Sequence, residues 1–315
     1  MLTLLLRRLA GLAATLVVAS LVVFAAMEIL PGDPAQVILG TEARPDTLAA
    51  LRAKLGLDRP LGERYAEWAT GLLHGDLGTS YTYATPVAEL VRDRVVVSLP
   101  LAVLSLALTV ALAIPLGVLA GARRNSLAEL GVMGATQIGI AVPNFWFAML
   151  LVLLFAVTLR WLPAGGFPGW GAGPWVALRS LVLPAVALAL PQASILARVM
   201  RSSLLETLGD DYIRTARAKG LSRSRTLWGH ALRNALIPVL TIMGLQFSFL
   251  LAGTIIIENV FYLPGLGRLV FQAINQRDLV VVRSVVMLLV ASVVIVNALV
   301  DLAYLVVDPR LRRRS

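Results

Sequence analysis

Long runs of apolar residues, separated by shorter polar segments, dominate the chain. Six runs reach the roughly 20 residues that a helix needs to cross about 30 Å of hydrocarbon at ~1.5 Å per residue. They cover residues 9–30, 99–121, 132–159, 177–198, 233–257 and 280–307. The pattern predicts an all-α polytopic membrane protein with six transmembrane helices. Because that number is even, both termini lie on one side of the membrane.

Prolines such as Pro115, Pro143, Pro184 and Pro191 lie inside these runs. Proline would break a helix in water, but neighbouring helices in a bundle can satisfy the carbonyls that it frees. We therefore expect kinks at these positions rather than helix ends. The first run follows two arginines, as in a secretory signal, but its length indicates a retained helix.

The segment between the first two runs is polar and predicts a small helical domain. Residues Pro45–Leu57 carry leucines at helical spacing, and residues Leu61–Leu73 repeat the pattern with Tyr65 and Trp68. Acidic residues balance the basic ones along residues 31–98. We expect a folded domain outside the cell rather than a linker.

Composition supports a membrane protein and excludes several other classes. Hydrophobic residues make up 58% of the chain and its mean hydropathy is +0.82, well above what a water-soluble core requires. With no cysteine, disulfides, iron–sulfur ligation and thiolate zinc sites are excluded. The net charge of +10 comes from basic segments between the apolar runs, as expected from membrane topology, and not from a basic face on a soluble domain that could bind nucleic acid.

Arginine and lysine are concentrated at one end of the predicted helices. Cytoplasmic segments carry an excess of these residues, so the basic segments predict the cytoplasmic side and place both termini there. The basic residues lie before the first helix, after the second, after the fourth and in the tail: Arg7, Arg8, Arg123, Arg124, Arg198, Arg201, Arg214, Arg217, Lys219, Arg223, Arg225, Arg233, Arg310, Arg312, Arg313 and Arg314.

These patterns divide the chain into four parts. We expect a tail and first helix at 1–30, an extracytoplasmic domain at 31–94, and a membrane core at 95–307. The core contains a long cytoplasmic loop at 199–232, and a basic cytoplasmic tail follows at 308–315.

The strongest functional signal is the segment from Asp210 to Gly220 in that cytoplasmic loop. It predicts a short helix in which Asp210 or Asp211 caps the start and Gly220 closes the end in a left-handed conformation. Ala216 and Ala218 leave room for another surface to approach, and the charged side chains supply contacts. Ser222 is expected to cap a second helix that runs on into the fifth membrane span.

The same loop resembles the ATPase-docking loop of ABC importer permeases. The resemblance rests on Thr215-Ala216, Gly220 and the run from His230 to Pro238, and it is closest to the dipeptide and oligopeptide branch, first-permease type. Arg214-Thr215-Ala216 stands where the general pattern has Glu-Ala-Ala, and Arg233 stands where it has a later proline. Segments elsewhere fit the same branch: Pro31-Gly32-Asp33-Pro34, residues 55–60, Gly75-Asp76-Leu77-Gly78, Pro143-Asn144-Phe145-Trp146, Arg201-Ser202-Ser203, Pro264-Gly265-Leu266-Gly267, and Asp308-Pro309-Arg310.

The resemblance implies a type I importer permease in the cytoplasmic membrane of a prokaryote. It implies a second homologous permease subunit, two ABC ATPase subunits or domains that bind ATP and Mg, and an extracytoplasmic substrate-binding protein. Peptides are the implied cargo, and nickel complexes or glutathione are the alternatives within the branch. The residues implied to couple transport to the ATPase are Asp211, Tyr212, Arg214, Thr215, Ala216, Arg217, Ala218 and Gly220.

Polar residues inside the predicted helices are candidates for function because unpaired polarity in hydrocarbon is costly. Asn297 and Asp301 are expected to form a structural network near the cytoplasmic end of the last helix. Other side chains could line a translocation path, or could equally bridge helices: Gln137, Asn144, Gln192, Ser194, Gln246 and Ser248. Glu258, at the outer end of the fifth helix, is a further path candidate that could contact a delivered substrate or lie in water.

The chain carries no sign of catalysis of its own. It contains no G-x-x-x-x-G-K-[ST] sequence, so ATP hydrolysis is assigned to partner subunits and no cofactor to this chain. His74 and His230 are expected on opposite sides of the membrane, which excludes a shared metal site. The competing class is a stand-alone secondary transporter, although we see no internal repeat of the kind such proteins often show.

Overall fold

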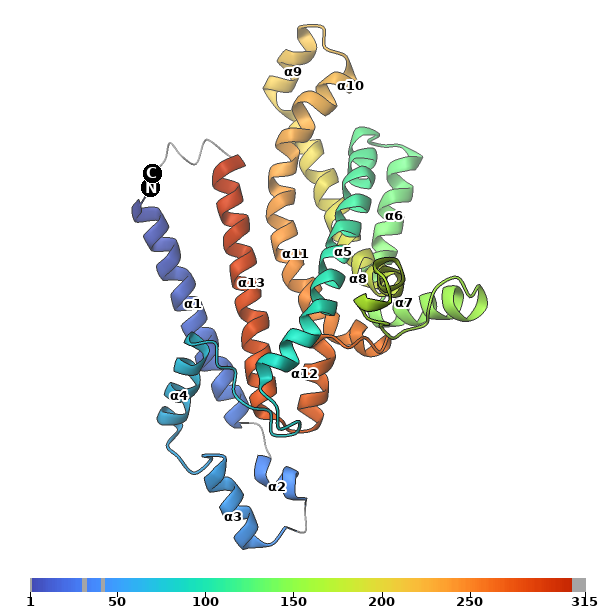
Figure 1. The fold of residues 1–315 in the computed structure, drawn as a ribbon. Helices are drawn as coiled ribbons and strands as arrows, with labels where there is room; N and C mark the ends of the chain where they lie inside the picture. Colours follow the sequence, from blue (N-terminus) through green and yellow to red (C-terminus); the bar gives the residue numbers. More distant parts are fainter. Residues whose placement is uncertain (1, 30–32, 41–42, 308–315) are drawn as a thin grey trace. The chain divides into compact units, whose positions relative to one another are not determined.

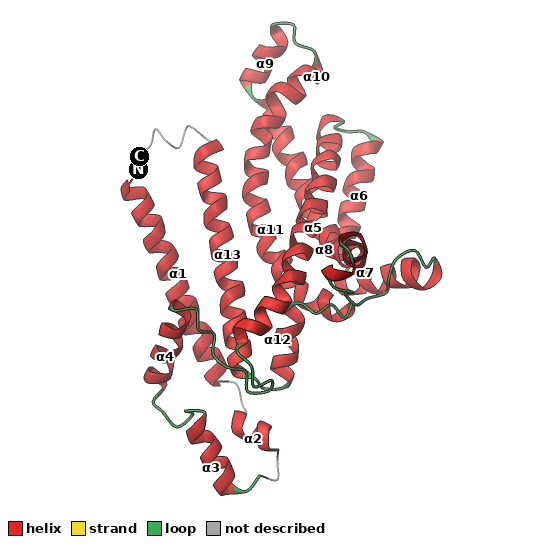
Figure 2. Cartoon of the chain, viewed as in Figure 1, coloured by secondary structure: helices red, strands yellow, loops and turns green. Residues whose placement is uncertain are grey.

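The protein is described by a computed structural model covering residues 2–29, 33–40 and 43–307. Every regular element in this part of the chain is helical (Figures 1 and 2). The elements are α1 (Leu2–Ile29), α2 (Pro34–Leu39), α3 (Pro45–Lys54), α4 (Leu61–Leu73), α5 (Val87–Ala122), α6 (Leu127–Ala141), α7 (Asn144–Leu151), η1 (Val152–Thr158), η2 (Trp170–Ala172), α8 (Pro174–Gly209), α9 (Asp211–Ala218), α10 (Arg223–Thr226), η3 (Leu227–Ala231), α11 (Leu232–Val260), α12 (Leu266–Asn275) and α13 (Leu279–Val307).

Five helical segments are long and apolar enough to cross a membrane: residues 9–29, 87–122, 174–209, 223–260 and 279–300. Counting the bent pair formed by residues 127–141 and 144–158 as one span brings the number to six. Both of the helices expected between the first two spans are present, as α3 and α4. The prediction of an all-helical membrane protein with six transmembrane helices is therefore confirmed, with the bent pair as the third span.

The third predicted span is not one kinked helix, so the prediction was wrong at Pro143. Helix α6 ends at Ala141, α7 begins at Asn144, and the two differ in direction by 102°. Pro143 lacks an N–H and forces the preceding residue out of the helical region, as the extended Val142 (φ −82°, ψ 123°) shows. In contrast, Pro115, Pro184 and Pro191 remain inside continuous helices, as expected.

The chain forms two compact units, and each has its own apolar core. The first unit contains residues 1–98 and 264–295, and the second contains residues 99–263 and 296–315. In the first unit, Val23 and Phe24 of α1 pack against Trp68 of α4 and Met287 of α13. A second cluster there joins the start of α5 to α12 and α13 around Leu269.

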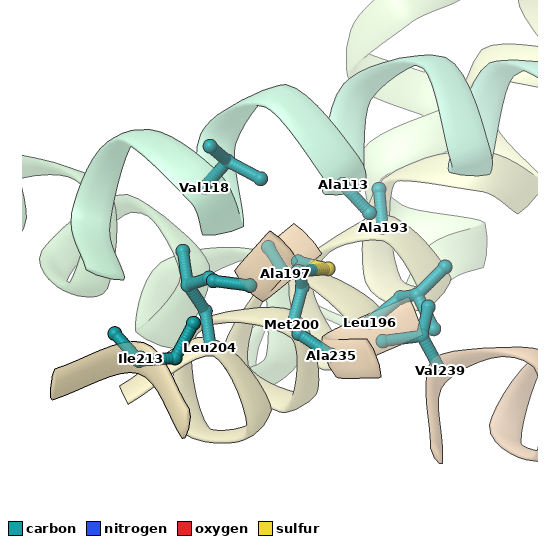
Figure 3. Packing of buried hydrophobic residues seen from close by; sticks show 11 residues of the cluster. Ala113, Val118, Ala193, Leu196, Ala197, Met200, Leu204, Ile213, Ala235 and Val239 are labelled. Atoms are coloured by element: carbon teal, nitrogen blue, oxygen red, sulfur yellow. The ribbon is translucent and has the colours of Figure 1, made fainter. Parts of the chain in front are cut away.

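The second unit is built around α8, which packs against α11, α6 and α7. Its core cluster joins residues of α5, α8, α9 and α11 around Met200 and Leu204 (Figure 3). Helix α5 approaches α8 closely, because a Cβ placed on Gly117 would lie 2.6 Å from the Ala197 carbonyl oxygen. Lipid tails are as apolar as the helix surfaces, so apolar surface alone does not hold two membrane helices together. Small residues such as Gly117 let the two backbones approach closely enough to pack.

Candidate functional site

The start of α9 differs from the prediction. Asp210 is the residue before the helix, in the extended conformation that a cap requires, but its side chain accepts no capping hydrogen bond. The Asp211 carboxylate lies 3.4 Å from Arg214 Nη1 instead. The predicted side-chain cap was therefore wrong. What remains is the favourable placement of Asp211 in the first turn, where it faces the positive end of the helix dipole.

The end of α9 agrees with the prediction. Gly220 has φ +89°, a conformation that side chains other than glycine rarely adopt. Its N–H donates to the Arg217 carbonyl at 3.0 Å, and the Leu221 N–H donates to the Ala216 carbonyl at 3.3 Å. These are the paired bonds of a Schellman motif. A Cβ on Gly220 would meet no atom within 4 Å, so its backbone conformation is what requires glycine here.

Two side chains attach α9 to the rest of the second unit. Ile213 is only 1% exposed and lies in the core cluster beside Leu204 (Figure 3). Tyr212 accepts a hydrogen bond from Asn234 Nδ2 of α11 at 2.6 Å. Burial of a side chain the size of Ile213 contributes about 1.5–3 kcal/mol, so this residue is the main anchor of the helix.

Most of the remaining α9 surface is exposed. Helices α9 and α10 extend beyond the ends of α5 and α6 (Figure 1). Ala216 is half-buried, and the remaining predicted coupling residues are exposed: Asp211, Tyr212, Arg214, Thr215, Arg217, Ala218 and Gly220. Trp228 in η3 is 60% exposed nearby in the sequence. A large aromatic side chain and several guanidinium groups are thus available to a partner surface.

Helix α10 continues into α11 as predicted. Ser222 accepts a hydrogen bond from the Arg225 N–H at 3.3 Å and caps the helix. Residues 223–260 then form one helical segment of 38 residues, with a π-helical stretch at Leu227–Ala231. Ser203 of α8 donates to the Ala235 carbonyl of α11 at 2.8 Å, which ties the helix entering the loop to the helix leaving it.

A charged pair that we did not single out from the sequence joins α6 to α8. Arg201 donates from Nε to Glu129 Oε1 at 2.7 Å and also from Nη2. The Asn125 N–H donates to Glu129 Oε2 at 2.5 Å, and Ser126 Oγ accepts from the Glu129 N–H. Ser126-x-x-Glu129 has the residue types of a capping box, although Glu129 accepts from Asn125 rather than from Ser126, so the local part of this arrangement was visible in the sequence. The partner Arg201, 72 residues later, was not.

Some of the polar residues proposed for a path form hydrogen bonds between helices, and others line a cavity. Gln246 donates to the Gln192 carbonyl at 2.8 Å, and Arg198 donates to Gln137 at 2.9 Å, so these pairs bridge helices. Asn144 and Gln192 line a cavity of about 230 Å³ at the break between α6 and α7.

Three side-chain oxygens near these helices are buried and accept or donate no hydrogen bond among the described residues. They are Gln192 Oε1, Gln246 Oε1 and Ser248 Oγ. Buried polar atoms are rarely left unsatisfied, so these three oxygens are polar groups with unused hydrogen-bonding capacity.

Three of the remaining residues lie elsewhere. Glu258 is fully buried near the end of α11, so it is not in contact with water as one reading of the sequence allowed. Asn297 is half-buried in α13. Asp301 also lies in α13, but its side chain is outside the described part, as is the tail at 308–315. The network expected between Asn297 and Asp301 therefore stays a prediction.

The helical spans define the class of protein as a multi-pass membrane protein, with α9 exposed at one end of the second unit. Two family descriptions match the chain. Residues 113–313 match the binding-protein-dependent transport system inner membrane component, and residues 1–102 match the N-terminal part of such membrane components. The chain belongs to this family and is a permease subunit of an ABC importer.

Relatives and solved structures agree with this assignment. The chain is 44% identical over 312 residues to a protein of Brucella abortus (strain 2308) named as a peptide transport system permease, covering 99% of both chains. It is 40% identical over 312 residues to the glutathione transport system permease protein GsiC of Salmonella choleraesuis (strain SC-B67), again covering 99% of both. The inward-facing structure of the MetNI methionine ABC transporter aligns with a TM-score of 0.59 at 20% identity, covering 70% of this chain and 96% of that one. The last likeness shows the fold alone.

Proposed function

We propose that α9 docks on a cytoplasmic ATPase subunit and passes its movement to α11. The observation that carries this proposal is the geometry of the loop. A short helix is anchored by Ile213, closed by Gly220, exposed on its remaining surface, and joined to α11 by the helical segment 223–260. When two ATPase subunits close on ATP, α9 moves with them, and the stiff connection shifts α11 in the membrane.

The proposed assembly contains two permease subunits, this chain and a homologous partner, with two ATPase subunits that bind ATP and Mg. An extracytoplasmic binding protein delivers the cargo. The basic segments support a cytoplasmic location for both termini, for the loop 199–232 and for the tail 308–315, in the cytoplasmic membrane of a prokaryote. Residues 31–94 then form the extracytoplasmic domain, and residues 95–307 form the core.

We propose peptides as the cargo. The support is the Brucella relative at 44% identity, which is named as a peptide transport system permease. Glutathione is the alternative supported by the relative at 40% identity, and nickel complexes are the alternative implied by the branch. In the proposed path, Asn144 and Gln192 meet the cargo at the cavity beside the α6–α7 break, with Gln246, Ser248 and Glu258 along α11.

The docking role is tested by replacing Gly220 with valine. A β-branched side chain at φ +89° strains the backbone by roughly 1–2 kcal/mol, so the end of α9 should change shape while the membrane helices stay intact. Gly209→Val is the matched control, because Gly209 has an ordinary φ and equal room for a Cβ. ATP-driven peptide uptake is measured in proteoliposomes that contain the complete transporter.

Gly220→Val is expected to lose most uptake while the subunit still inserts in the membrane, and Gly209→Val is expected to keep it. Normal uptake together with normal ATPase association in Gly220→Val would contradict the docking role. The cargo is tested separately, by thermal shift of the binding protein encoded beside this chain with a dipeptide, glutathione and a nickel chelate. Stabilisation by the nickel chelate alone would contradict peptide import.

A further inference from the structure

The first unit contains a cavity that the proposed path does not use. Its volume is about 450 Å³, within the range typical of small-molecule sites. It lies between the end of α3, helix α4, the segment around residues 76–81 and the start of α13. Four cations and two carboxylates are among its lining residues: Lys54, Arg59, Arg64, Arg283, Glu67 and Asp76.

Arg283 is the unusual member of this set. Its Cζ lies 4.9 Å from the centre of the Trp68 ring and 5.4 Å from that of Phe24, so two aromatic side chains hold the guanidinium. Its Nε is buried and has no hydrogen-bond acceptor. Arg283 forms no ion pair with any described carboxylate, whereas burying a charge without a partner is costly.

The other two arginines that line the cavity do have carboxylate partners. Arg64 donates to both oxygens of Glu28, at 2.9 and 2.7 Å, and Arg59 pairs with Glu67 at 3.0 Å. These two cations are therefore paired, whereas the charge of Glu28 acts on Arg283 without forming an ion pair with it. Trp68 Nε1 is a second buried donor without an acceptor. Tyr81 also lines the cavity, and its burial raises the pKa of its hydroxyl, which stays protonated and able to donate.

We infer that this cavity binds the carboxylate of a small peptide, with the Arg283 guanidinium as its charged partner. A carboxylate supplies both the missing negative charge and two acceptor oxygens in the plane that a guanidinium recognises. Asp76, which also lines the cavity and has no ion pair among the described residues, provides negative charge for the peptide ammonium group. The choice of a peptide as the carboxylate carrier rests on the proposed cargo, but the anion site itself rests on Arg283 alone.

The inference is tested with the full chain in nanodiscs of neutral lipid, without ATPase subunits. Binding of Ala-Ala and of its C-terminal amide is compared by saturation-transfer NMR. The acid should bind about tenfold or more tightly than the amide, because a charge-assisted bidentate contact is lost in the amide. Arg283→Gln should remove that preference. Arg44→Gln, which removes an exposed arginine of the same segment that does not line the cavity, should keep it.

Equal binding of acid and amide, or an unchanged preference in Arg283→Gln, would overturn the inference. A second measurement on the unmodified chain covers the case in which Arg283→Gln does not fold. Ala-Ala, but not its amide, should protect Arg283 from phenylglyoxal while Arg44 still reacts, as read by mass spectrometry. Failure of protection would also overturn the site. Neither result depends on α9, so failure of the docking role would leave this test unaffected.

Discussion

At the scale of single residues, the pair formed by Glu129 and Arg201 fixes the helix that leads into the loop. The carboxylate accepts from one guanidinium and one backbone N–H, and both side chains lie mostly out of solvent. Removing one partner leaves the other charge uncompensated, which usually costs more than the pair itself contributes. The pair therefore matters for holding α6 against α8.

We predict that Glu129→Gln lowers the unfolding temperature of the purified subunit by about 2–4 °C or more, because Arg201 loses its countercharge. Glu206→Gln is the control, since Glu206 is exposed on the same α8 and forms no ion pair among the described residues. Thermal unfolding followed by circular dichroism in detergent measures both. Equal unfolding temperatures in the two variants would show that the pair does not stabilise α6 on α8.

A second prediction concerns the pH dependence of Tyr81. Burial is the main reason that its pKa lies above the ordinary 10.0, partly opposed by the nearby charges of Arg283 and Arg64. A raised folded-state pKa means that the unfolded chain loses this proton first as pH rises. The stability that Tyr81 contributes is therefore complete below pH 10 and is lost as pH climbs through the folded-state pKa.

Absorbance titration of the native protein and of Tyr81→Phe isolates this hydroxyl by difference. The difference curve should have its midpoint above that of exposed tyrosines. Arg283→Gln should move the midpoint higher still, because it removes a positive charge that favours tyrosinate. A midpoint at or below the ordinary value would show that Tyr81 is solvated.

How far the sequence predicts single residues depends on how local their partners are. Gly220 and Ser222 were identified because a helix end depends on the few residues around it. The predicted cap at Asp210 was wrong although the backbone of Asp210 has the conformation of a cap. Its carboxylate accepts no hydrogen bond from the N–H groups at the start of α9. Arg283 could not be found, since its surroundings come from α1 and α4, more than 200 residues earlier in the chain.

At the scale of elements, the break between α6 and α7 shows that hydropathy predicts a membrane-spanning segment but not whether its helix is continuous. Residues 132–159 are apolar enough for one span, and a composition window cannot distinguish a straight helix from two short ones. The helix ends here because Pro143 holds the preceding residue, Val142, in an extended conformation. The cavity lined by Asn144 and Gln192 lies at this break, so the feature that the pattern missed is also the one that creates space between helices.

Helix α9 supplies a prediction at the same scale. Eight residues are too few for a helix to be stable alone, so α9 should depend on the burial of Ile213. Ile213→Ala removes about 2–5 kcal/mol of core packing, which should detach the helix and expose Arg214 and Arg217 to trypsin. Ile213→Val removes one methylene and should give an intermediate cleavage rate. Equal cleavage of all three proteins would show that other contacts hold α9.

At the scale of the whole molecule, the patterns along nearly the whole chain identify the family and the fold, but they do not identify the cargo. The chain matches relatives named for peptide and for glutathione transport with similar identity, 44% and 40%. Polar side chains in the helices serve as bridges as well as cavity walls, so residue type alone does not identify the cargo. Side chains that contact the cargo must instead be found by variants and binding measurements.

Orientation in the membrane is the last property set by the chain as a whole, and the absence of cysteine makes it directly testable. Arginine excess at one end of the helices predicts that Ser224 faces the cytoplasm and that Thr47, in α3, faces outward. Both residues are exposed in the structure, so each can be replaced by cysteine without disturbing a core. A membrane-impermeant maleimide should label Thr47→Cys in intact spheroplasts, but label Ser224→Cys only after permeabilisation. The unmodified protein should stay unlabelled. Labelling of Ser224→Cys in sealed spheroplasts would reverse the orientation, and α9 would then have no access to an ATPase.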